Sequence, residues 1–274
     1  MTANLWSGRS RSLTSALALL LLMTGAVWAA TGRGRPAKIG EYNAADATVE
    51  MFAAIDKGDI AVKLIPKDSR QARVMITNKT DKPLNVKLPE AFAGVPVLAQ
   101  AGLAGGGGGT GRSGGSNGGN QSMGGGMGGM GGMGGGGMGG GMGMFNVPPE
   151  KVGQFSVTTV CLEHGKREPQ AKVPYEIKPL ESFTSKPGVR ELCELLGSGR
   201  VSQRAAQAAA WHLNNGMTWQ ELATKRYDLA NGTKPPYFSA QEIQNGMQVA
   251  ATAIRLSEER QKQDSGTSAS QSQK

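Results

Sequence analysis

Apolar and polar residues alternate with a period of two along several short segments of this chain, which is the pattern of half-buried β-strands. Turn clusters rich in proline, asparagine, aspartate and serine separate these segments. The pattern predicts strands at residues 60–64, 72–77, 84–88, 95–98, 155–162 and 173–177. Before the first of them, residues 46–57 carry apolar positions at helical spacing, and Gly58 should end that helix.

From Pro187 onward the apolar spacing becomes helical. Ser202 is placed to cap one helix, and Thr218–Glu221 and Ser239–Glu242 have the form of capping boxes. In the last helix, Ile243, Met247, Ala250 and Ile254 share one apolar stripe. The expected helices cover residues 189–196, 203–213, 218–229 and a long segment from 240 onward.

Six short strands followed by helices predict an α+β chain. We expect a small antiparallel, immunoglobulin-like β-sandwich over residues 46–100 and 147–186, followed by a C-terminal helical region over residues 187–262. Residues 30–45 should form a polar linker. Residues 263–274, which are rich in serine and glutamine, should form a disordered tail.

Glycine and methionine dominate residues 101–146, and this tract separates the two halves of the expected sandwich. Glycine loses the most backbone entropy on ordering and offers no side chain to bury, so the tract is predicted to be a disordered Gly/Met-rich loop. Because the cost of closing a loop grows slowly with its length, deleting most of the tract should leave the fold intact.

Residues 1–29 have the three parts of a secretory signal peptide. Arg9 and Arg11 give a positive start, residues 13–23 an apolar centre, and Val27-Trp28-Ala29 a small-residue cleavage site. The apolar centre is shorter than the about 20 residues that a membrane span needs. We therefore expect a secreted or periplasmic protein with no stable membrane span after cleavage.

The formal net charge is +9, but basic residues are interspersed with acidic ones and form no long block. The charge pattern therefore predicts no nucleic-acid partner. The sequence contains no H-E-x-x-H metalloprotease motif and no P-loop lysine. Together these observations predict a protein that is not an enzyme, with no catalytic residues and no cofactors.

Two cysteines follow the tract, Cys161 in an expected strand and Cys193 in an expected helix. Oxidising compartments favour a disulfide between them, and two unpaired, buried, apolar cysteines are the alternative. His164 and His212 are the only histidines, and with the cysteines they make a set that is formally competent for zinc. Its spacing matches no zinc-finger pattern, so we expect both histidines at the surface or at the edge of the core.

The methionines of the tract are a candidate metal site, because thioethers are soft ligands that select Cu(I). The spacing Met127-x-x-Met130-x-x-Met133 resembles methionine-rich copper motifs of exported proteins. The alternative is a neutral spacer in which the methionines are incidental. The full candidate set is Met123, Met127, Met130, Met133, Met138, Met142 and Met144.

Two short segments, Val160-Cys161-Leu162 and the alanine-rich residues 206–211, resemble the cysteine and glutamine signatures of bacterial thioester adhesion domains of the TQXA type. That resemblance implies an internal thioester that traps nucleophiles of a host, with Cys161 as the thiol partner and Gln207 as the acyl partner. The chain as a whole is similar to uncharacterised secreted proteins of planctomycete-type bacteria, which implies export and a sandwich.

Helical spacing offers a different account of the same alanine-rich segment. Trp211 would pack on the sandwich while Gln207 faces water, and replacing an exposed glutamine by alanine should then change stability little. The inward face of this helix would be Ala206, Ala209, Ala210 and Leu213.

The sequence therefore predicts an exported, non-enzymatic interaction or structural protein of the envelope or the extracellular space. Its partner would be an envelope or extracellular protein or polymer that the sequence does not identify. Two alternatives stay open: a covalent adhesin with a Cys–Gln thioester, and a periplasmic Cu(I)-binding protein.

Overall fold

A computed structural model describes three stretches of the chain, residues 39–97, 119–128 and 143–271. The expected signal peptide lies outside them, as do most of the expected linker and much of the glycine and methionine tract. None of the helices in these stretches has both the length and the hydropathy of a membrane span.

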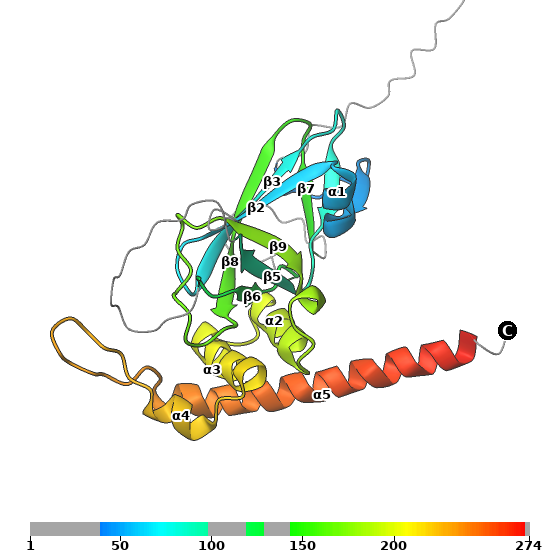
Figure 1. Cartoon of the computed structure of the whole chain (residues 1–274). Helices are drawn as coiled ribbons and strands as arrows, with labels where there is room; N and C mark the ends of the chain where they lie inside the picture. Colours follow the sequence, from blue (N-terminus) through cyan, green and yellow to red (C-terminus); the bar gives the residue numbers. More distant parts are fainter. Residues whose placement is uncertain (1–38, 98–118, 129–142, 272–274) are drawn as a thin grey trace, which may run out of the picture. The chain divides into compact units, whose positions relative to one another are not determined.

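Six antiparallel strands close into a barrel in the order β2-β3-β8-β6-β5-β9 (Figure 1). The ring closes where β9 pairs with β2, through Tyr175 and Leu64. The largest apolar cluster includes Val74, Ile76 and Phe92 of these strands, all of them fully buried. The strands are β2 (Ile60–Pro66), β3 (Gln71–Asn78), β5 (Phe92–Pro96), β6 (Met123–Gly125), β8 (Val152–Cys161) and β9 (Tyr175–Pro179).

A second, three-stranded sheet has β4 (Leu84–Lys87) at its centre, with β1 (Ala47–Glu50) parallel to it and β7 (Met144–Val147) antiparallel. Helix α1 (Met51–Lys57) follows β1 and ends, as expected, at Gly58 in the left-handed conformation. Inside this sheet the buried Asn146 donates to the side-chain oxygen of Asn85 at 2.9 Å, so the two amides tie β7 to β4.

The expected immunoglobulin-like sandwich is wrong, because the strands form a closed barrel beside a small mixed sheet. Each of the six expected strands overlaps an observed one, but β1, β6 and β7 were not expected. Strand β6 lies between β5 and β8 and joins them into one ring. Periodicity does not separate the two architectures, since alternate residues face inward in both.

Part of the glycine and methionine tract is therefore a barrel strand. Met123 and Met127 are fully buried in the core, and Gly124 pairs with Ala93 of β5 and Val160 of β8. The expectation that the tract adds nothing to the core is wrong for residues 119–128. Glycines are needed there because the space for side chains is already filled. A Cβ at Gly124 would meet Cys193 of α2, one at Gly125 would meet Thr158 and Phe92, and one at Gly126 would meet backbone atoms of Glu90 and of α2.

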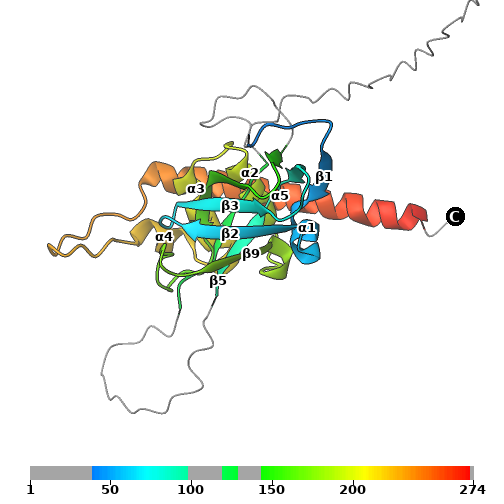
Figure 2. The ribbon, with the colours of Figure 1, turned by 90° about the horizontal axis from the view of Figure 1, so that it is seen from above.

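Four helices gather on one side of the barrel, and Figure 2 shows β2 and β3 lying over them. They are α2 (Val189–Gly197), α3 (Gln203–Asn215), α4 (Trp219–Thr224) and α5 (Ala240–Gln271), preceded by the short 3-10 helix Leu180–Ser182. Both capping boxes and the Ser202 cap form as expected. Helix α4 stops at Thr224, earlier than expected, and α5 continues to Gln271 through most of the segment expected to be disordered.

Candidate functional site

Helix α3 covers a free edge of strand β8 with two glutamine side chains. Strand β3 pairs with β8 only as far as Thr159, whose N–H donates to the carbonyl oxygen of Arg70 at 2.8 Å. Gln203 donates to the carbonyl oxygen of Thr159 at 3.0 Å. Gln207 accepts from the N–H of Cys161 at 2.8 Å and donates to its carbonyl oxygen at 2.9 Å. The carboxamide of Gln207 therefore takes the place of a strand residue.

Helix α3 and strand β8 fit each other because the rise of one helical turn is close to the rise of two strand residues. Four helical residues rise about 6 Å and two strand residues about 6.6 Å, so Gln203 and Gln207 meet Thr159 and Cys161 in register. The N–H and C=O of a residue in an antiparallel strand point to the same side, and a primary amide offers a donor and an acceptor in one plane. Cys161 and Gln207 are 1% and 2% exposed, so this contact excludes water.

The structure thus brings together the two residues of the thioester resemblance. The contact runs through the backbone of Cys161, while its Sγ lies 3.8 Å from the carbonyl oxygen of Ser69. The alternative that placed Gln207 in water is wrong, because the edge of β8 supplies buried partners for its amide. Trp211 is buried in the same apolar cluster as Cys161, next to Ala208.

Cys161 and Cys193 are both free, buried thiols in the structure, which corresponds to the unpaired alternative and not to a disulfide. Successive residues of a strand face opposite sides. Val160 shares a cluster with Cys193, whereas Cys161 belongs to the cluster of Trp211. Burial raises the pKa of both thiols, that of Cys193 to about 12.

We expect neither thiol to react with an aromatic disulfide reagent in the native protein near neutral pH. Both are shielded from the reagent, and a raised pKa leaves little of the reactive thiolate. Release of the coloured leaving group should begin only when denaturant is added. Rapid stoichiometric labelling of either cysteine in the folded protein would contradict this burial.

Three of the candidate copper ligands, Met123, Met127 and Met144, lie in the described part of the chain. Met123 and Met127 are core residues with no exposed surface, and Met144 is in β7. Among residues 39–97, 119–128 and 143–265, no three His, Cys, Asp or Glu side chains are grouped so that they could hold a metal. The other candidates lie outside the described residues: Met130, Met133, Met138 and Met142.

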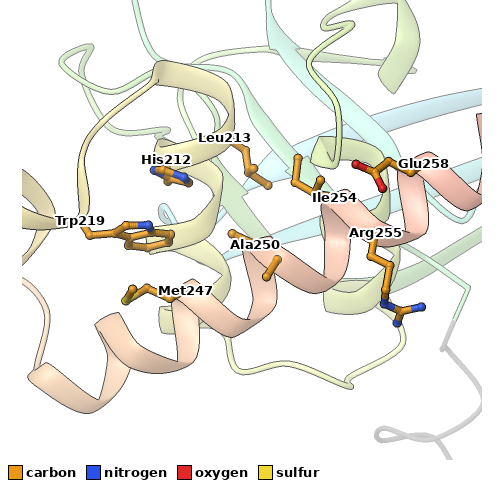
Figure 3. Close-up of a pocket in the computed structure, with 9 residues that line it drawn as sticks. His212, Leu213, Trp219, Met247, Ala250, Ile254, Arg255 and Glu258 are labelled. Carbon is orange, nitrogen blue, oxygen red and sulfur yellow. The ribbon is translucent and has the colours of Figure 1, made fainter.

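A groove of about 530 Å³ lies between α5 and the adjoining ends of α3 and α4 (Figure 3). Arg255 and Glu258 lie at one end of it. Met247 lies at the other end and is 46% exposed, which is high for a large apolar side chain among apolar neighbours. The apolar lining consists of Met247, Ala250, Ala251 and Ile254 from α5, with Leu213 and Trp219 opposite.

His212 and Trp219 form a rigid part of the opposite wall. Their rings stack with centroids 4.2 Å apart and an interplanar angle of 28°. His212 Nδ1 lies 2.7 Å from the carbonyl oxygen of Met217, and because a carbonyl only accepts, Nδ1 carries a proton. These contacts fix the positions of both rings in the wall.

Sequence periodicity assigned Met247 to the same stripe as Ile243 and Ala250, which are buried in the structure. The buried face of α5 also includes Val249, Ala253 and Ser257, which lie on the side of Ala250 away from Met247. The stripe alone therefore gave no signal for a groove. No protein-family model, curated protein or solved structure matches this chain.

Proposed function

We propose that this chain is an exported, non-enzymatic interaction protein that binds an apolar segment of an envelope or extracellular partner in the groove between α3, α4 and α5. The observation that carries the proposal is the half-exposed Met247 at a concave, apolar surface with preformed walls. Methionine adapts its shape to different apolar partners, and an exposed apolar groove gains free energy when a partner covers it.

The shape of the groove favours a helical partner segment. Met247, Ala251, Ile254 and Glu258 follow each other at helical spacing along α5, so the groove runs along this helix. The small side chain of Ala251 allows a partner backbone to approach closely. An amphipathic helix that lies in such a groove is a common recognition mode, and the charges at one end would set its direction.

The proposal is tested with a photo-crosslinking amino acid placed in α5. At Met247 it should give a covalent adduct with a partner in the cells that make and export the protein. At the neighbouring Gln248, which is exposed but does not line the groove, it should not. Equal adducts at both positions, or none at either, would reject the groove as the binding site.

Met247→Glu should weaken partner binding by about tenfold or more, since a carboxylate would have to be buried against apolar side chains. The free energy of unfolding should change by no more than about 0.5 kcal/mol, because the side chain is half exposed. Affinity for the partner recovered by crosslinking and denaturant unfolding of the free protein measure the two effects. Gln248→Glu is the matched control and should change neither.

Export is tested separately by the N-terminal sequence of the protein outside the cytoplasm. The cleavage site Val27-Trp28-Ala29 predicts a mature chain that begins directly after Ala29 or Ala30. An exported chain that still begins at Met1 would refute cleavage.

The contact between Cys161 and Gln207 favours a second candidate function, a covalent adhesin. Cys161 Sγ would attack the side-chain carbonyl carbon of Gln207, the thiol proton would pass to the leaving nitrogen, and ammonia would depart. A partner amine would then attack the thioester, form an amide at residue 207 and release the thiol. The amide of Gln207 would have to give up both of its hydrogen bonds to reach Sγ.

Intact mass distinguishes this candidate from the first. A thioester removes one ammonia from the mature chain, and methylamine should add to residue 207 with release of a free thiol. Cys161→Ser and Gln207→Ala should each abolish both signals. A mature mass equal to that of the sequence, with no methylamine adduct, would reject the adhesin and leave the groove proposal untouched.

A further inference from the structure

Residues 225–237 form a hairpin loop between α4 and α5, with one antiparallel bridge between Arg226 and Pro236, seen as the long orange loop at the left of Figure 1. Tyr237 N–H donates to the carbonyl oxygen of Lys225 at 2.8 Å, and Tyr227 N–H to that of Pro235 at 2.9 Å. The rest of the hairpin is largely exposed. Its attachment to the body therefore depends on the residues at its base, Lys225, Tyr227 and Tyr237.

Lys225 has an unusual set of partners. Its Nζ lies 2.9 Å from His164 Nε2 and over the rings of Trp211 and Tyr237, at 5.4 and 5.3 Å from their centroids. Among the described residues, no carboxylate forms an ion pair with it. The aromatic faces favour the charged ammonium. An ammonium only donates, so His164 Nε2 must accept, which requires a neutral imidazole.

The charges around His164 keep it neutral. Burial lowers its pKa, the Lys225 charge lowers it further, and Glu221 of α4 acts weakly in the opposite direction. The nearby acids are engaged elsewhere: Glu221 caps α4 by bonding to Thr218, and Glu163 pairs with Lys166. Other titratable groups at the hairpin base include Glu168, whose charge acts on Tyr237 and on Cys161. Arg204, which pairs with Glu242 of α5, and the phenols of Tyr227 and Tyr237 also lie there.

We propose that the contact between His164 and Lys225 is an acid-sensitive latch that holds the base of the hairpin against the barrel. At neutral pH the imidazole accepts a hydrogen bond from the ammonium. When His164 takes up a proton from solvent, the acceptor becomes a second cation and the contact is lost. Arg204 still donates to the carbonyl oxygen of Tyr237, and its contact with the Lys225 side is a long 3.5 Å approach to the Tyr227 hydroxyl. The hairpin therefore loosens from its Lys225 side while the Tyr237 side stays attached.

Docking of the hairpin should weaken as the pH falls, because proton binding and docking are linked. A histidine whose pKa is lower with the hairpin docked than with it released stabilises docking fully above its ordinary pKa of about 6.5. That stabilisation is lost as the pH falls from there through the docked pKa. The opening equilibrium should rise about tenfold for each pH unit by which the docked pKa lies below the ordinary one.

Two independent measurements on the full chain test the latch. Histidine NMR gives the pKa of His164. Its signal is distinguished from that of His212 because it disappears in the variant His164→Gln. Hydrogen exchange of the Tyr227 and Tyr237 amides, corrected for intrinsic rates, gives the opening of the hairpin between neutral and acidic pH. We expect the pKa of His164 to be lowered and the two hairpin amides to exchange faster in acid. The increase in exchange should be about tenfold for each pH unit by which the pKa of His164 is lowered. Barrel amides such as that of Val74 should not change.

Two variants distinguish the latch from a general loss of stability of the protein in acid. His164→Gln keeps a neutral acceptor at every pH, so hairpin exchange should become independent of pH with the hairpin still docked. Lys225→Met keeps an apolar stem without the charge, so the His164 pKa should rise towards its ordinary value. A His164 pKa at or above the ordinary value in the wild type, or hairpin opening in acid that persists in His164→Gln, would overturn the proposal.

Discussion

Replacing Gly126 by alanine should lower the free energy of unfolding by about 3 kcal/mol or more. An added Cβ would overlap the carbonyl oxygen of Glu90 and lie 2.5 Å from that of Cys193 and 3.1 Å from the Cα of Gly197. All three obstacles are backbone atoms, so no side-chain rotation relieves the clash. Either α2 must move away from β6 or the strand must leave the barrel. Denaturant unfolding of the purified protein measures the change.

Gly128→Ala is the matched control from the same tract. Among the described residues, apart from its chain neighbours, an added Cβ there comes no closer than 3.7 Å to another atom, which is ordinary contact. Stability should therefore change by less than about 1 kcal/mol. If Gly126→Ala were as stable as Gly128→Ala, the packing of α2 on β6 would be wrong. By the same reasoning, a deletion that removes residues 119–128 should not be tolerated.

Gln207→Ala should cost about 2–5 kcal/mol, because it leaves the N–H and C=O of Cys161 buried without partners. Gln203→Ala removes one hydrogen bond at a partly exposed position and should cost about 1 kcal/mol. Thermal or denaturant unfolding of both variants provides the comparison. Equal, small losses would show that α3 does not complete the edge of β8.

Gln207→Glu is a finer test of the same contact. A carboxylate keeps the acceptor for Cys161 N–H but faces the Cys161 carbonyl oxygen with no proton to donate. The buried acid should therefore have a raised pKa in the folded state. Stability should be highest below the unfolded pKa of about 4.3 and decline as the pH rises through the folded value. A stability unchanged across this range would contradict the paired geometry.

Local periodicity predicted many of the strands and helices of this fold, because alternation and helical spacing indicate which face of an element is buried. Closure of the barrel depends on β6, whose sequence Met123-Gly124-Gly125 has no apolar period. Its place is set by its pairing with β5 and β8 and by the close approach of Cys193 of α2, which no local pattern encodes. The hairpin did carry a signal: Asn231-Gly232 is a strong turn dipeptide, and Gly232 adopts a φ of +79°.

The candidate sites divide in the same way. Gln207 stands among alanines, and nothing within α3 indicates that its amide will meet the end of a strand 46 residues earlier. The groove is formed by three helices, and only their packing shows that Met247 stays exposed. Such features arise between elements distant in sequence, so they follow from tertiary packing and not from the pattern of any one segment.

The way the barrel closes has a consequence for how the protein is made. Strands β2 and β5 are synthesised early, yet each has an edge that only β9 covers. Until Pro179 has been synthesised, both edges stay unpaired and able to associate with other chains. Folding should therefore begin late and then proceed cooperatively, and the nascent chain should depend on holdase chaperones until its ninth strand is complete.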